Sequence, residues 1–158
     1  MLRSIPQGVI SIKTRQVVVE SIDISFPWGY FDGSAAGDPK VCGAEGILFF
    51  SEECFISFKD GLGNGTNNYA ELLGLKLLLK LALENHIIKL QVFGDSHLVI
   101  NWVNGLYRMH NLLLSPLLSK VIKFSGMLDS VIFQHIYRER NYVADGFEKD
   151  GSMVREGV

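Results

Sequence analysis

The chain of 158 residues is long enough for one domain with a buried core, and its formal net charge is −2. Hydrophobic residues make up 47% and charged residues 20%, which excludes an intrinsically disordered chain. The net charge argues against a strongly basic nucleic-acid binder, although clustered bases could still form a local binding surface. Cys42 and Cys54 are too few for a disulfide framework, so we expect reduced thiols in a cytoplasmic or nuclear protein.

Residues 1–26 are expected to be an N-terminal extension or linker, with an edge strand somewhere within 17–26. Apolar and polar residues alternate over 21–26, which is typical of a half-exposed strand. The first nineteen residues contain three basic side chains and no acid, a weak feature of organelle-targeting segments. A linker is the simpler interpretation, and both interpretations stay open.

Residues 28–60 are expected to form an antiparallel meander of three strands. Turn-forming residues at 37–39 and 51–53 separate three apolar, strand-like runs. The expected strands cover residues 30–34, 46–50 and 54–59. The glycine-rich segment that follows ends the meander.

Helices and strands alternate in the rest of the chain. Thr66 or Asn67 is expected to cap a helix that continues to about residue 85, and two lysines within its apolar run argue against a membrane span. The later expected elements are a strand over 87–93, a helix over 96–103, a helix within 111–128, a strand over 131–137 and a short helix over 141–150. In the helix within 111–128, Ser115 is expected as the N-cap and Pro116 in the first turn, with a longer helix kinked at Pro116 as the alternative.

This order predicts an α/β fold with a mixed five-stranded sheet, three antiparallel strands followed by two parallel ones, and helices on both faces. We expect the folded domain to cover residues 27–150 and a C-terminal tail to cover 151–158. No internal repeat or low-complexity tract divides the chain further.

Four acidic residues occur where strands end or helices begin. Asp32 and Asp95 follow apolar, strand-like runs, whereas Glu71 and Asp145 lie near the starts of helices. Carboxylates that converge from such positions suit hard divalent cations, which prefer oxygen ligands, and a pair of such cations suits phosphoryl transfer. Taken singly, each acid also has an ordinary explanation as a turn, cap, first-turn or surface residue.

Four short motifs surround these acids. They are Asp32-Gly33-Ser34, Thr66-Asn67-Asn68-Tyr69-Ala70-Glu71-Leu72, Asp95-Ser96 and Asn141-Tyr142-Val143-Ala144-Asp145. In this sequence order, and on this order of strands and helices, they resemble the type 1 ribonuclease H family, most closely the version found in plant retroelements. The resemblance covers about residues 28–150.

The resemblance implies an endoribonuclease that hydrolyses the RNA strand of RNA/DNA hybrids and leaves a 5′-phosphate and a 3′-hydroxyl. It implies two Mg²⁺ ions, or Mn²⁺, as cofactors. Asp32 would bridge both ions, and Glu71 and Asp95 would complete the ion on the leaving-group side. Asp145 would hold the ion that activates the attacking water. No membrane partner is expected, and a monomer is the simplest state.

The resemblance also implies contacts with the hybrid. The expected substrate-binding residues are Ser34, Thr66, Asn67, Asn68, Ser96, His97 and Asn141. The two neighbouring asparagines would read the minor groove, where the 2′-hydroxyl distinguishes RNA from DNA. Ser34 and Asn141 would act beside the acids as hydrogen-bonding supports, and His97 has the alternative of an ordinary helix-surface residue.

Several positions depart from the family pattern. Asp38 is an acid where a neutral donor to the DNA phosphate is usual, and the mobile-loop histidine of many bacterial members is missing. His135 is expected to be a sheet residue and not a catalytic base. Glu45 stands where the family usually has a small residue, and Gly146 weakens the helix that carries Asp145.

One further departure from the family pattern and two rival functions complete the prediction. Residues 105–114 carry only two basic side chains, so the affinity for substrate is expected to be modest and sensitive to salt. The first rival is a weakened or inactive module that binds nucleic acid or a protein. The second is a 3′–5′ exonuclease of the same superfamily, which the Thr66-Asn67-Asn68 motif disfavours.

Overall fold

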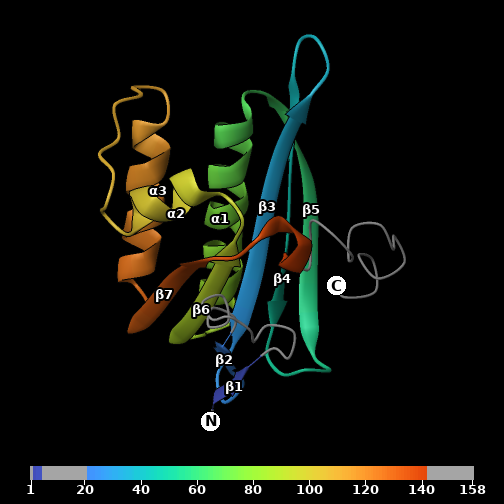
Figure 1. Cartoon of the computed structure of the whole chain (residues 1–158), viewed down its shortest axis with the longest axis vertical. Coiled ribbons are helices and arrows are strands. Elements are labelled where there is room, and N and C mark those ends of the chain that lie inside the picture. The colour runs from blue at the N-terminus through green and yellow to red at the C-terminus, as the bar shows by residue number, and fades with distance from the viewer. Residues whose placement is uncertain (1, 5–20, 142–158) are drawn as a thin grey trace, which may run out of the picture.

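The computed structural model describes residues 2–4 and 21–141 of the chain (Figure 1). Its centre is a five-stranded sheet in the order β5-β4-β3-β6-β7. The strands are β3 (Trp28–Ala36), β4 (Val41–Phe49), β5 (Phe55–Asn64), β6 (Lys89–Gly94) and β7 (Ser130–His135). β3, β4 and β5 pair antiparallel, whereas β6 pairs parallel with both β3 and β7. The predicted mixed sheet is therefore confirmed.

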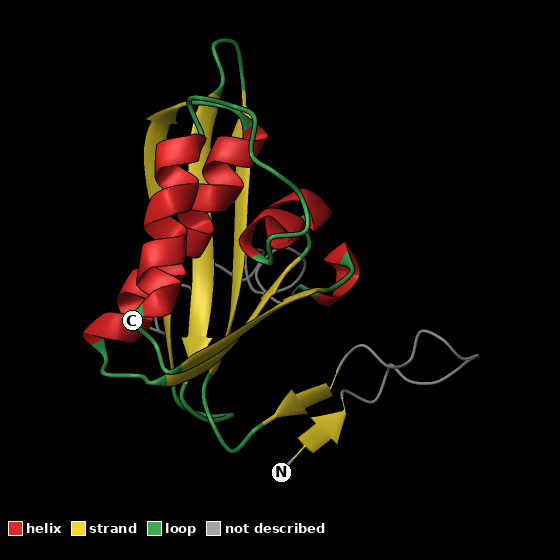
Figure 2. Ribbon diagram, turned by 90° about the vertical axis from the view of Figure 1, so that its left-hand side faces the viewer, coloured by secondary structure: helices red, strands yellow, loops and turns green. Residues whose placement is uncertain are grey.

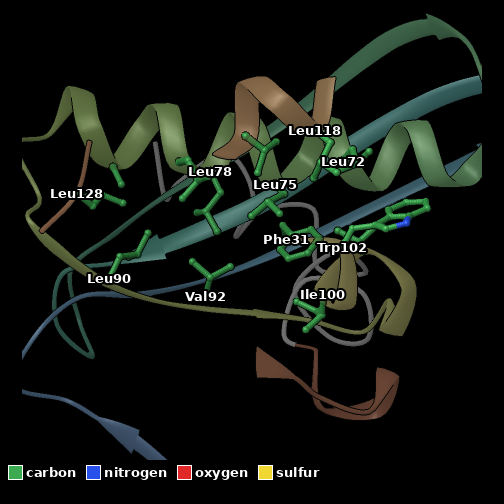
Figure 3. Packing of buried hydrophobic residues seen from close by; sticks show 14 of the residues in the cluster. Phe31, Leu72, Leu75, Leu78, Leu90, Val92, Ile100, Trp102, Leu118 and Leu128 are labelled. Carbon is green, nitrogen blue, oxygen red and sulfur yellow. The ribbon is translucent and has the colours of Figure 1, made fainter. Parts of the chain in front are cut away.

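Three α-helices cover one face of this sheet (Figure 2). They are α1 (Asn67–Glu84), α2 (His97–Val103) and α3 (Ser115–Gly126), and a short 3-10 helix, η3 (Arg138–Arg140), follows β7. The helices and the sheet bury one apolar cluster between them, and Figure 3 shows Phe31, Leu75 and Val92 at its centre. Removing such side chains from water is the main stabilising contribution to the fold.

Side-chain caps fix the first residue of two helices. The Thr66 hydroxyl accepts a hydrogen bond from the Tyr69 amide at 3.2 Å, and the Ser96 hydroxyl accepts one from the Val99 amide at 3.2 Å. Each cap satisfies a donor that the first turn leaves open. The predicted cap at Thr66 is confirmed.

The start of α3 differs from the prediction. Ser115 is its first helical residue, and the N-cap position falls on Leu114, which makes no side-chain cap. The carboxamide oxygen of Asn111 instead accepts hydrogen bonds from the Leu113 and Leu114 amides. The prediction was wrong because an asparagine that turns the chain just upstream supplies the acceptor.

The opposite face of the sheet carries a second, largely aromatic cluster. Its buried residues are Ile22, Trp28, Tyr30, Ile47, Phe49, Phe93 and Ile136. Ile22 of this cluster precedes β3 in the chain and belongs to β2 (Ser21–Asp23). β2 pairs antiparallel with β1 (Leu2–Ser4). The strand expected within 17–26 thus exists, but it lies outside the five-stranded sheet (Figure 2).

A glutamine side chain holds β2 against the main sheet. The Gln91 carboxamide accepts a hydrogen bond from the Asp23 amide at 2.9 Å and donates one to the Asp23 carbonyl at 2.8 Å. The helix expected over 141–150 lies outside the described residues except for Asn141. Among the described residues, no helix has the length and apolar character needed to cross a membrane.

Candidate metal centre

Strand alternation directs the Asp32 side chain away from the helices. Its neighbour Phe31 packs in the helix-side cluster, whereas Tyr30 packs in the second cluster. Because successive side chains of a strand point to opposite faces, Asp32 projects from the same face as Tyr30. Its side chain lies beside the end of the second cluster and not in the apolar core.

Close packing between β3 and α1 brings Glu71 beside Asp32. A β-carbon at Gly33 would lie 2.2 Å from the Ala70 carbonyl carbon and 2.5 Å from the Glu71 nitrogen. A β-carbon at Gly74 would lie 2.7 Å from the Asp32 carbonyl oxygen. Only glycine permits both backbones to approach this closely, so these two positions set the separation of Asp32 and Glu71.

The third carboxylate comes from the end of β6. Asp95 follows Gly94 directly, and β6 pairs in parallel with β3, so both strands run toward the same edge of the sheet. One carboxylate oxygen from each of Asp32, Glu71 and Asp95 lies within 4.8 Å of the other two. The structure thus brings three of the four predicted ligands together. The fourth, Asp145, lies outside the described residues.

The carboxylate group has the features of a cation site. Asp32 is only 4% exposed, and Asp32 Oδ1 and Glu71 Oε1 are buried without a hydrogen-bond partner in the described part of the chain. A buried, unsatisfied carboxylate oxygen is costly, and a hard divalent cation is the ligand that satisfies it best. These residues therefore fit a Mg²⁺-type ion.

Burial and mutual repulsion disfavour the ionised forms of these acids. Burial, followed by the charge of Asp95, raises the pKa of Asp32 from 3.8 to about 6. Burial, followed by the charge of Asp32, raises the pKa of Glu71 from 4.5 to about 9. Glu71 therefore holds a proton at neutral pH unless a cation replaces it, whereas Asp32 loses its proton near pH 6.

An arginine lies at the same site. Arg138 Nη1 is 3.2 Å from Asp95 Oδ2 and 3.9 Å from Asp32 Oδ1, although its side chain is 65% exposed. Burial acts to lower the pKa of Arg138, but the nearby charges of Asp32 and Asp95 outweigh it and raise the pKa. Arg138 was not among the site residues predicted from the sequence. One feature of the sequence could have indicated it: Arg138 is a basic residue between the strand expected over 131–137 and the motif that starts at Asn141.

Two histidines border the site on the side of Asp95. The rings of His97 and His135 stack with centroids 3.5 Å apart and an interplanar angle of 14°. Burial, followed by the neighbouring His97, lowers the pKa of His135. His135 lies in β7, in agreement with its prediction as a sheet residue, but its stacking partner was not foreseen.

The remaining polar residues of the motifs surround the carboxylates in different ways. The Asn67 carboxamide oxygen accepts a hydrogen bond from the Ala35 amide at 2.7 Å, which ties the start of α1 to the end of β3. Ser34, Thr66 and Asn67 are exposed, and Asn68 is half-buried, so this edge presents hydroxyl and amide groups to solvent.

Asn141 has a different environment. Its side chain is fully buried, and its carboxamide nitrogen donates a hydrogen bond to the Phe31 carbonyl at 3.0 Å. This places Asn141 beneath the backbone that carries Asp32. The geometry matches a hydrogen-bonding support beside the acids and not a direct surface contact.

Comparisons with known proteins agree with this geometry. The sequence model of the reverse transcriptase-like family matches residues 30–151. The N-terminal RNase H domain of a Mycobacterium tuberculosis protein is 22% identical with a TM-score of 0.72, over 83% of this chain and 94% of that one. Ribonuclease H1 of Halobacterium salinarum is 23% identical with a TM-score of 0.69, over 83% and 96%. LC11 ribonuclease H1, solved with an RNA/DNA hybrid, is 24% identical with a TM-score of 0.68, over 82% and 97%.

Proposed function

Because the chain belongs to the reverse transcriptase-like family and has the ribonuclease H fold, we propose that it hydrolyses the RNA strand of RNA/DNA hybrids. The convergence of Asp32, Glu71 and Asp95 is the observation that carries this proposal. The proposed reaction is an endonucleolytic cut that leaves a 5′-phosphate and a 3′-hydroxyl. One of the structural neighbours, LC11 ribonuclease H1, was solved with such a hybrid, which supports this substrate class.

The proposed cofactors are two Mg²⁺ ions, with Mn²⁺ as a substitute. Asp32, Glu71 and Asp95 are the described residues that would hold them, and Asp145 is proposed to complete the set. When bound, such ions polarise the phosphate, activate water and stabilise the departing oxygen. Asp32 Oδ1 and Glu71 Oε1, which are buried and have no hydrogen-bond partner among the described residues, support this assignment.

The residues around the carboxylates have proposed roles in holding the hybrid. Asn67 and Asn68, at the start of α1, are proposed to contact the minor groove, where amides can bond to base edges and the 2′-hydroxyl. Arg138 would offset the negative charge of Asp95 and Asp32 as the phosphate approaches. Asn141 would keep the β3 backbone in place below Asp32.

A cleavage assay tests the function. The purified chain is incubated with an RNA/DNA hybrid labelled on either strand, with Mg²⁺, Mn²⁺ or a chelator. We expect metal-dependent internal cuts in the RNA strand alone. Asp32→Asn should lower the rate by at least roughly 1000-fold, since several kcal/mol of metal-mediated stabilisation would be lost.

Other outcomes would point elsewhere. Binding of the hybrid without cleavage in either metal would favour a module that binds nucleic acid. Arg138 gives that alternative a physical basis, because it already places a cation against two of the three carboxylates. Stepwise removal of nucleotides from a 3′ end would instead indicate an exonuclease.

A further inference from the structure

A row of three charged residues crosses the sheet next to the candidate metal centre. Asp32 on β3 pairs in register with Glu45 on β4, and Glu45 pairs in register with Lys59 on β5. Residues that face one another across paired strands project from the same face of the sheet. Glu45 and Lys59 therefore extend from the site of Asp32 toward the β5 edge.

Glu45 is an unfavourable residue at this position when considered alone. It is only 8% exposed and lies directly opposite another acid, where like charges destabilise a sheet. The structure thus buries an acid at a position where the ribonuclease H family usually has a small residue. Lys59 offsets this cost, because its ammonium nitrogen lies 3.9 Å from Glu45 Oε1.

Lys59 remains available to a second anion. Its side chain is 55% exposed, and 3.9 Å is too long for a hydrogen bond to Glu45. The ion pair therefore confines the ammonium group over the sheet without a hydrogen bond from its N–H donors to Glu45 Oε1. An ammonium held this way is a suitable point charge for a phosphate.

A hollow of about 250 Å³ lies between this lysine and Asp32, and its lining also includes the acids Glu45 and Asp60. Its floor includes Gly43 and Gly61, which pair in register, so no side chain rises from either position. A β-carbon at Gly61 would meet nothing within 4 Å. Ser34, which pairs with Gly43 from the other side, supplies an exposed hydroxyl at the rim.

We propose that this hollow binds a backbone phosphate of the nucleic acid, with Lys59 and Ser34 as its polar contacts and Glu45 as the residue that positions Lys59. The inference rests on the proposed function, because it concerns the strand that passes over Asp32. Because Gly43 and Gly61 have no side chains, the nucleic-acid strand can approach the sheet closely here. The ion pair with Glu45 holds the ammonium group of Lys59 beside that strand. The hollow lies on the β5 side of Asp32, so this phosphate would be a different one from the phosphate at the carboxylates.

The test is the salt dependence of hybrid binding. The parent protein is the full chain with Asp32→Asn, so that binding is measured without cleavage. Lys59→Ala in this background should make the slope of log K against log salt concentration less steep by about 0.9, the contribution of one phosphate contact. Lys59→Arg should restore most of the slope. Lys120→Ala, which removes an exposed lysine from α3 on the helix-covered face, should leave it unchanged.

A second variant separates phosphate binding from neutralisation of Glu45. Glu45→Gln with Lys59→Ala removes both charges, so the buried carboxylate no longer needs a cation. The reduced slope should persist in this double variant. A slope equal to that of the parent, in either the single or the double variant, would overturn the inference, as would a parent that does not bind the hybrid.

The two proposals can fail separately. If the unmodified chain cuts the hybrid but Lys59→Ala leaves the salt slope unchanged, the phosphate site is wrong and the enzyme remains. If the chain does not cut the hybrid but the slope changes as expected, the phosphate contact stands and the proposed catalysis is wrong.

Discussion

The two sides of the candidate metal centre are held by different forces. On the side of β3 and α1, Asp32 and Glu71 are fixed by backbone packing, because Gly33 and Gly74 let the strand and helix touch. On the side of β6 and β7, Asp95 lies among polar and partly exposed groups, including Arg138 and the stacked histidines. The first side is fixed by steric fit, and the second by charge.

This difference indicates how each side responds to change. Steric contacts between backbones are short-ranged and unforgiving, so a single added methyl group can displace the whole element. Ion pairs at an exposed arginine are weak and depend on salt. Their loss therefore changes the electrostatic potential at the site more than it changes the stability of the fold. Substitutions on the steric side should therefore cost more stability than substitutions on the charged side.

The largest effect is expected from Gly33→Ala. The new β-carbon would overlap the Ala70 backbone at 2.2 Å, and neither backbone can move without repacking the core. We expect the free energy of unfolding, measured with urea, to fall by about 3 kcal/mol or more. Gly126→Ala is the matched control, because its β-carbon would meet nothing within 4 Å at the end of α3. Equal effects at both positions would contradict the steric account.

The metal-free protein should lose stability as pH rises. The folded-state pKa values of Asp32 and Glu71 are raised to about 6 and about 9, so the folded state binds more protons than the unfolded state above pH 4. The stability that these two groups contribute is fully present below about pH 4 and is lost as pH rises through their folded-state pKa values, by several kcal/mol at roughly 1.4 kcal/mol for each pKa unit. Urea unfolding with a chelator at pH 5 and pH 8 measures this fall.

Two controls sharpen the pH prediction. Glu71→Gln should flatten the stability curve above about pH 6, because it removes the group with the higher pKa. Added Mg²⁺ should restore stability at pH 8, since it binds the folded carboxylates and not the unfolded chain. A metal-free protein that is more stable at pH 8 than at pH 5 would refute the assignment.

Asn141→Ala tests the support beneath Asp32. The substitution leaves the buried Phe31 carbonyl without this donor, so we expect a loss of about 2 kcal/mol in the free energy of unfolding. Asn104→Ala is the matched control, because Asn104 also donates to a strand carbonyl, that of Phe133, but is exposed. There the expected loss is about 0.5 kcal/mol, because water replaces the donor. Equal losses would show that burial does not distinguish the two.

Arg138→Gln should have the smallest effect on stability and a measurable effect on metal binding. Its guanidinium group lies 3.2 Å from one carboxylate that would hold the cation, so it competes with that cation. Removing it should tighten Mg²⁺ binding by roughly fivefold, or about 1 kcal/mol, in a calorimetric titration. Arg108→Gln makes the same charge change at another exposed arginine and should leave Mg²⁺ affinity unaltered. Weaker binding in Arg138→Gln would mean that the arginine supports the metal site.

Much of the fold followed from local patterns in the sequence. The order of strands and helices and the cap at Thr66 rest on residues close together along the chain. Such signals act through backbone preferences and short-range hydrogen bonds, which the sequence states directly. Boundaries were less accurate, as β5 continues to Asn64 and not to residue 59.

The sequence by itself also determined which carboxylates would meet, since Asp32, Glu71 and Asp95 each follow a recognisable motif at a strand end or helix start. Only the tertiary structure decided what stands beside them. Arg138, the stacked pair of His97 and His135, and the row from Asp32 to Lys59 join residues that are far apart along the chain. Strand register and side-chain direction bring these residues into contact. Because both are set by packing across the whole sheet, no local sequence pattern predicts them.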